Sequence, residues 1–253
     1  MALPKLNDSP SYELIVPSTG KTVNYRPYLV KEEKVLMIAF ESGDTKHSMR
    51  EIGNTLNACL HSAGINVFDL TTFDVEYMFT QIRSKAVGEV ANVLIACKSC
   101  GHKNEYELDV TDIKVSKPLV EENVIQLTTD VVVELEYPTY GAVCALESLG
   151  DKDTVNQGFE MAKLSLKTIK TEEDRFNVKD YSKKEITEFV ESMTTDQFQK
   201  ISNFLTGIPA VTYEDIFECS SCKEVNEIKK IISELKKVRD YILKLKKIEE
   251  NIF

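Results

Sequence analysis

The chain has 253 residues, of which 42% are hydrophobic, and it carries a formal net charge of −10. This size and composition suit one large or two ordinary globular domains. The acidic balance argues against nucleic acid as the main partner, because phosphate binding depends on Lys and Arg. The longest apolar runs, 35–40 and 90–96, are far shorter than the roughly 20 residues that span a bilayer, so no membrane span is expected.

Hairpin and helix patterns fill the first ninety residues. The predicted elements are a β-hairpin over 12–16 and 22–25 and helices over 30–42, 45–61 and about 71–88. Pro17 and Gly20 suit the hairpin turn, since one restricts φ and the other permits unusual φ values. Thr71 and Asp74 have capping-box spacing at the start of the third helix. We expect residues 1–90 to form a hairpin plus a helical layer.

Strand patterns follow residue 90, and helical patterns return after residue 140. The strand candidates are 93–95, 106–110, 124–127 and 131–137. Ser182 and Thr194 begin capping-box sequences before two short helices. From Ile228 onward, apolar residues recur every three or four positions between lysines, which predicts a long amphipathic helix. This helix could dock on its own domain or pack against another subunit.

These patterns predict an α+β fold in four parts. They are a hairpin plus helical layer over 1–90, a zinc-ribbon-like β module over 91–140 and 210–228, a helical insert over 141–209, and a C-terminal amphipathic helix over 229–253.

Four of the six cysteines stand in two Cys-x-x-Cys pairs, Cys97 with Cys100 and Cys219 with Cys222. One such turn supplies half of the tetrahedron that Zn²⁺ prefers, and two turns complete it. Aligned on their second cysteine, both pairs share the sequence Ser-Cys-x-x-x-Asn-Glu. Two similar knuckles are typical of a zinc ribbon, so we expect one structural zinc ion on all four cysteines. Four protein ligands leave no open position for catalysis at the metal.

Other readings of the cysteines carry less support. A redox dithiol requires a Cys pair at a helix N-terminus, whereas both pairs here lead into polar or strand-like sequence. His102 follows the first pair, but two thiol pairs already satisfy the metal, and Cys59 and Cys144 are expected to be core residues. Cysteines at metal spacing and the absence of a signal-like start indicate a reducing, cytosolic compartment. No phosphate loop, metalloprotease motif or nucleophile elbow occurs.

Two segments resemble a known family. They are Tyr25-Arg-Pro-Tyr-Leu-Val-Lys-Glu-Glu-Lys-Val-Leu36 and Phe73-Asp-Val-Glu-Tyr-Met-Phe-Thr-Gln-Ile-Arg-Ser-Lys-Ala-Val-Gly-Glu89, followed by Cys97-x-x-Cys100-Gly101. These are similar to the baseplate hub and hub assembly proteins of T-even-type bacteriophages. The resemblance is strong over about residues 10–115 and resumes at the second Cys pair, after which this chain continues further than the family tends to.

The resemblance implies a protein of tail morphogenesis that is not an enzyme. Its partners would be other phage baseplate or hub proteins, with no nucleic acid, membrane span or small-molecule substrate. Its location would be the host cytoplasm during assembly and the baseplate of the virion tail. We also expect an ion-paired cluster that joins the hairpin to the helical layer and contributes to partner binding: Arg26, Asp74, Glu76, Arg83 and Lys85. The alternative is a set of solvated helix faces, because surface ion pairs add only about 0–1 kcal/mol each.

Two other functions compete with this reading. One is a zinc-ribbon nucleic-acid binder or transcription accessory protein, which the acidic residues beside the knuckles disfavour: Glu105, Glu107, Asp109, Glu218 and Glu224. The other is a redox or hydrolytic enzyme, for which the sequence offers three histidines and no recognised constellation.

Overall fold

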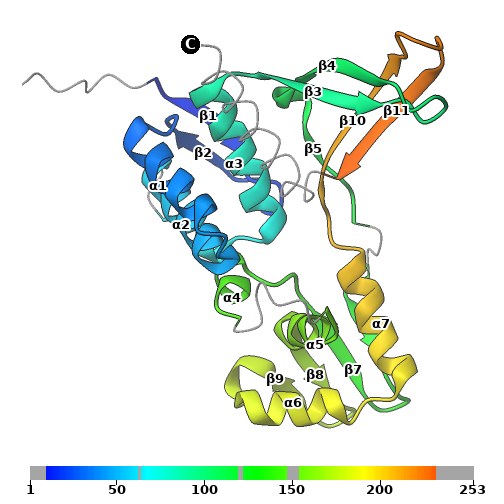
Figure 1. The fold of residues 1–253 in the computed structure, drawn as a ribbon. Coiled ribbons are helices and arrows are strands. Elements are labelled where there is room, and N and C mark those ends of the chain that lie inside the picture. The colour runs from blue at the N-terminus through cyan, green and yellow to red at the C-terminus, as the bar shows by residue number, and fades with distance from the viewer. Residues whose placement is uncertain (1–9, 62–63, 119–121, 147–153, 232–253) are drawn as a thin grey trace, which may run out of the picture.

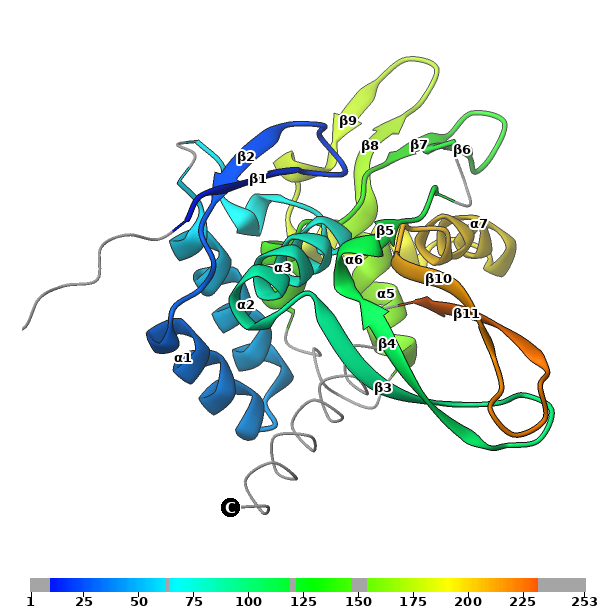
Figure 2. The same cartoon turned by 90° about the horizontal axis from the view of Figure 1, so that it is seen from above.

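The structure is a computed structural model that describes residues 10–61, 64–118, 122–146 and 154–231. Helices and strands both contribute, which confirms the α+β class. Figures 1 and 2 show three modules: a hairpin with helices, a pair of β-ribbons, and a small sheet with helices. No helix in these described ranges is long and apolar enough to cross a membrane.

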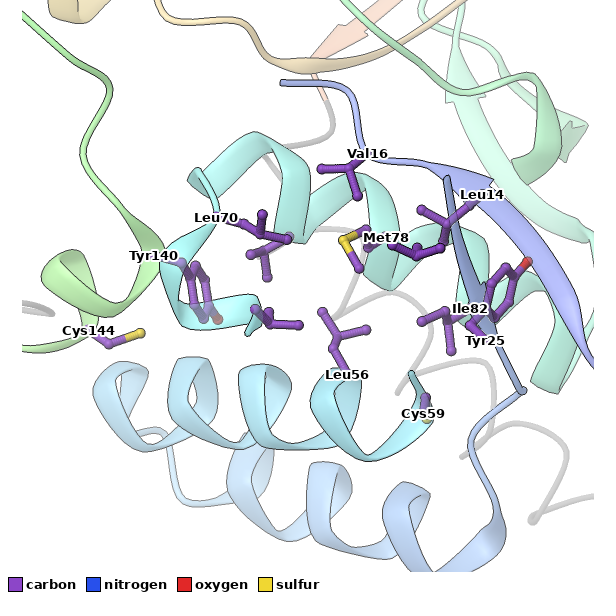
Figure 3. Close-up of a cluster of buried hydrophobic side chains, with 13 residues drawn as sticks. Leu14, Val16, Tyr25, Leu56, Cys59, Leu70, Met78, Ile82, Tyr140 and Cys144 are labelled. Carbon is purple, nitrogen blue, oxygen red and sulfur yellow. The ribbon is translucent and has the colours of Figure 1, made fainter. Parts of the chain in front are cut away.

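The N-terminal module packs a hairpin and helices around one core. Its elements are β1 (Tyr12–Ile15), β2 (Thr22–Tyr25), α1 (Val30–Glu41), α2 (Thr45–Cys59), the 3₁₀ turn Val67–Asp69, α3 (Thr72–Val87) and α4 (Tyr140–Cys144). Leu56 of α2 and Met78 and Ile82 of α3 are completely buried, with Val16 of the hairpin above them (Figure 3). The predicted hairpin and helices are confirmed, and α4 joins them from a segment that lies far along the chain.

A buried carboxylate fixes α3 to the hairpin. Asp74 is completely buried and forms the predicted capping box with Thr71. The same carboxylate also binds the hairpin turn, because Ser18 donates its backbone N–H to Oδ1 at 2.8 Å and its hydroxyl to Oδ2 at 2.6 Å. The three-residue spacing of Thr71 and Asp74 in the sequence predicts the capping box, whereas the hydrogen bonds to Ser18 depend on tertiary packing.

The ribbon module consists of two sheets that pack through their apolar faces. β3 (Val90–Ala96) pairs with β4 (Lys103–Asp109), and β10 (Val211–Glu218) pairs with β11 (Val225–Ile231) and with the short β5 (Lys114–Val115). The core between the two ribbons includes Val110, Ile113, Val211, Tyr213 and Ile228. Both ribbons project from the body and their tips meet (Figure 1).

The third module is a four-stranded antiparallel sheet covered by helices. Its elements are β6 (Val124–Gln126), β7 (Val132–Leu135), α5 (Thr154–Ser165), β8 (Leu166–Lys170), β9 (Arg175–Asn177), α6 (Lys183–Glu191) and α7 (Thr195–Thr206), with strand order β6-β7-β8-β9. Val133, Leu135 and Ile201 are completely buried in its core. The capping boxes at Ser182 and Thr194 are present as predicted.

The structure differs from the expected division in two places. Strands β6 and β7 fall within the range 91–140 assigned to the ribbon, but they pair with β8, so the insert over 141–209 is a sheet with helices rather than helices alone. Residues 229–231 belong to β11, because the alternation around Ile228 lets this segment pair with β10. The rest of the helix predicted over 229–253 lies outside the described residues.

Tyr137 links the N-terminal and third modules. Its ring meets Phe73 of α3 edge-on, with centroids 5.7 Å apart, and stacks on Phe204 of α7 at 5.1 Å. Beside it, the Tyr140 N–H donates to the Leu70 carbonyl at 2.7 Å. The connection between β7 and α4 therefore holds the two modules in contact.

Candidate metal centre

The two Cys-x-x-Cys turns have the same backbone geometry. In the first, Cys97 N–H donates to the His102 carbonyl at 2.8 Å, and Gly101 N–H donates to the Cys97 carbonyl at 3.0 Å. In the second, the same bonds join Cys219 to Glu224 at 2.9 Å and Lys223 to Cys219 at 3.0 Å. Gly101 (φ 71°) and Lys223 (φ 64°) occupy equivalent positions with left-handed backbone. The shared sequence therefore corresponds to a shared fold.

Four sulfur atoms converge where the ribbon tips meet. Cys97 Sγ lies 3.7 Å from Cys222 Sγ, Cys100 Sγ lies 3.7 Å from Cys219 Sγ, and all four lie within 4.8 Å of one another. A disulfide would need about 2.05 Å, and all four thiols are free. Tetrahedral zinc with Zn–S bonds near 2.3 Å places its sulfur atoms about 3.8 Å apart. The arrangement is therefore compatible with a metal site.

One asparagine from each knuckle crosses to the other. Asn104 is buried, with its Nδ2 at 3.6 Å from Cys219 Sγ, and its Oδ1 accepts the Ser220 N–H at 2.8 Å. Asn226 mirrors it, with Nδ2 at 3.4 Å from Cys97 Sγ and Oδ1 accepting the Lys98 N–H at 2.9 Å. Sequence reasoning noted these asparagines as part of the shared motif and gave them no role. Their equal spacing from the second cysteine was the available signal.

Hydrogen-bond donors favour the thiolate form of the two buried cysteines. The backbone N–H of Cys100 lowers the pKa of Cys97 to about 6, with help from Ser99 N–H and Asn226. The backbone N–H of Cys222 likewise lowers the pKa of Cys219. Because metal ligands must be deprotonated, these donors favour the ligand form of Cys97 and Cys219. Cys97 and Cys219 are buried while Cys100 and Cys222 are exposed, so the centre lies at the surface.

A tyrosine–aspartate cluster sets the spacing of the two ribbons. Tyr106 on β4 donates to Asp215 on β10 and lies 2.9 Å from the Tyr213 hydroxyl, which donates to Asp215 at 3.2 Å. This cluster crosses between the sheets, so the strands reach the tips at a fixed separation. Alternation alone did not identify these residues.

The structure also locates His102, Cys59 and Cys144. His102 supplies its backbone carbonyl to the knuckle, and the potential ligand group found within the described residues contains only cysteines. Cys59 and Cys144 are buried in the N-terminal core, as predicted.

The prediction that Arg26, Asp74, Glu76, Arg83 and Lys85 form one ion-paired cluster is wrong. Arg26 pairs with Glu32 at 2.9 Å, and Lys85 pairs with Glu89 while lying 5.3 Å from the centroid of the Tyr12 ring. Among the ion pairs of the described residues, none joins two members of the predicted set. Asp74 is instead committed to capping α3, and Glu76 is half-buried. Their role in partner binding remains a prediction.

Comparison with protein families gives one match. The family model described as T4 bacteriophage base plate protein matches residues 9–237. The chain belongs to this family. The match contains both cysteine pairs and elements of all three modules. No curated protein and no solved structure matches the chain. Membership of the baseplate family supports a structural role in the phage baseplate, with other phage baseplate proteins as partners.

Proposed function

We propose that this protein is a component of the central baseplate hub, or a factor needed to assemble that hub, and that it acts by protein–protein contact during tail morphogenesis. The observation that carries the proposal is the baseplate-family match over 9–237. Its refinement to the hub rests on the resemblance of the segments 25–36 and 73–89. The protein would work in the host cytoplasm and in the virion tail.

We further propose that the four cysteines hold one structural zinc ion and that the protein is not an enzyme. The sulfur spacing of 3.7 Å and the four-thiolate donor set suit Zn²⁺. The four ligands close the coordination shell, so the ion would join the two ribbon tips and leave no position for substrate. A baseplate part requires a rigid surface more than a reactive one.

Fractionation of infected cells tests the hub assignment. Mass spectrometry would compare finished tails, purified hub subassemblies, peripheral baseplate subassemblies and whole lysate. A hub component should be present in hubs and finished tails. A hub assembly factor should associate with hubs in the lysate and be absent from finished tails. Recovery only with peripheral baseplate subassemblies would contradict both forms of the proposal.

Metal analysis tests the zinc assignment. The purified chain should contain about one zinc per molecule, and Cys219→Ser should lose it, because three thiolates bind far less tightly than four. Cys144→Ala is the matched control, since Cys144 lies in the N-terminal core and this variant should keep its zinc. Two zinc ions per chain, or none with all thiols free, would contradict a shared site.

A further inference from the structure

An apolar groove opens between the β8–β9 hairpin and α6 in the third module. Its volume is about 320 Å³, and apolar side chains supply almost all of its lining, among them Ile169, Phe176, Val178, Ile186 and Phe189. Tyr181, which also lines it, is 42% exposed. The module therefore leaves an apolar groove between its sheet and α6.

The turn beside this groove is acidic. Glu172, Glu173 and Asp174 join β8 to β9, directly after Thr171 of the groove lining, and all three are exposed. No ion pair within the described part of the chain includes any of the three. Two nearby bases are paired elsewhere, since Arg175 lies beside Glu134 and Lys184 beside Glu188. The groove thus presents apolar surface beside uncompensated negative charge.

Residues 232–253 have the complementary chemistry. Leu235, Val238, Ile242 and Leu245 recur at helical spacing. The whole segment 232–253 contains six Lys or Arg residues and four Asp or Glu, a net charge of +2, whereas the rest of the chain carries −12. An amphipathic helix laid into an apolar groove is an established recognition mode, and the basic side chains would meet the acidic turn.

Position in the fold favours a segment from another molecule. Residues 232–253 follow directly from β11 in the ribbon module, whereas the groove lies at the opposite end of the molecule beside β9 and α6 (Figure 1). A helix of 22 residues would span about 33 Å, and residue 232 follows the end of β11 directly in the sequence. We propose that the groove of one copy of this protein receives residues 232–253 of a second copy.

Such a contact joins two different surfaces, so it closes either as a dimer in which two copies exchange their segments or as larger rings and filaments. Sedimentation of the full-length chain should therefore show concentration-dependent association into dimers or larger species. A chain that stays monomeric over the whole concentration range would overturn the proposal.

A charge swap between two variants tests the pairing. Glu172→Lys with Glu173→Lys reverses the turn, and Lys236→Glu with Lys237→Glu reverses the segment. Each double variant alone should associate about tenfold more weakly, because both of its contacts then bring like charges together. In a one-to-one mixture each groove meets a segment of opposite charge, so association should return. Circular dichroism should show unchanged folding, since the substituted turn is exposed.

Glu105→Lys with Glu107→Lys is the matched control, because it makes the same charge change on the exposed face of β4. Association of this control should equal that of the natural chain. Loss of association in the control would show a net-charge effect and overturn the proposal. Failure of the mixture to recover would also overturn it, because the segment would then bind its own chain or a different partner.

Discussion

Asn104 and Asn226 each bond twice to the opposite knuckle through one amide group. The Nδ2 group approaches a thiolate of the opposite knuckle while Oδ1 accepts a backbone N–H from that same knuckle. Mutation of groups that orient metal ligands typically lowers metal affinity by about 10–100-fold. The pair also explains why the motif repeats an asparagine at one fixed distance from each cysteine pair.

Replacing either asparagine should weaken metal binding without unfolding the chain. We expect Asn104→Ala and Asn226→Ala each to reduce zinc affinity about 10–100-fold, measured by competition with a chromophoric chelator. Asn92→Ala is the matched control, because Asn92 is exposed on β3. Equal zinc affinity in all three variants would contradict a role for the crossed amides.

The carboxyl group of Glu76 should make the stability of the folded protein depend on pH. Burial raises the pKa of its carboxyl group to about 7, above the ordinary value of 4.5. As pH rises, the unfolded chain loses this proton near pH 4.5, whereas the folded protein keeps it until about pH 7. The free energy of unfolding is therefore highest below about pH 4.5 and falls as pH rises through about 7. Glu76→Gln should stabilise the protein by about 1–3 kcal/mol at pH 8 and change little at pH 4.

Urea unfolding of both proteins at the two pH values measures this effect. Glu41→Gln is a suitable control, because Glu41 is an exposed carboxylate at the end of α1. If the stability difference between Glu76→Gln and the natural chain is the same at pH 4 and pH 8, burial of the Glu76 carboxyl group is not its cause.

At the scale of elements, the β7–α4 connection joins two modules that the sequence separates. Tyr137 contacts Phe73 of α3 and Phe204 of α7, and the backbone beside it bonds to Leu70. Aromatic pairs of this kind contribute about 0.5–1.5 kcal/mol beyond the area they bury. One side chain thus couples the helical layer to the sheet module.

Tyr137→Ala should uncouple those modules. We expect the total stability to fall by about 2–4 kcal/mol and calorimetry to resolve two unfolding transitions in place of one. Phe159→Ala removes a stacked pair with Phe198 that lies within the third module, so it should lower stability and retain a single transition. Two transitions in both variants, or one in both, would contradict a specific linking role for Tyr137.

At the scale of the whole molecule, the metal centre closes a long loop of chain. Residues 97 and 222 meet at the ribbon tips, while the third module lies between them in sequence. The ribbon core is the smallest of the three described cores, with five buried side chains. A small core of this kind gains most from an added metal link.

Removal of zinc should therefore loosen the ribbons selectively. After chelation we expect hydrogen exchange to accelerate at least tenfold in β3, β4, β10 and β11, with little change in α2 and α3. Cys219→Ser should reproduce this pattern without chelator, because it removes one ligand. Uniform acceleration along the whole chain would indicate global unfolding and contradict a local clamp.

The sequence alone determined the local features of this protein. Capping boxes at Thr71, Ser182 and Thr194 are formed by residues three positions apart, so their spacing predicts them directly. The four cysteines were identified for the same reason, since each knuckle is local and the two share one motif. Family membership was also foreseen from contiguous segments.

Only the tertiary structure decided which distant segments meet. Val133 and Leu135 alternate as any strand would, and nothing local assigns them to β8 rather than to the ribbon. Arg26 could pair with any nearby acid, and packing brought it to Glu32. The crossed amides of Asn104 and Asn226 likewise exist only once the two tips meet. Periodicity specifies which face of an element is buried, whereas shape and charge across the assembled fold specify its partner.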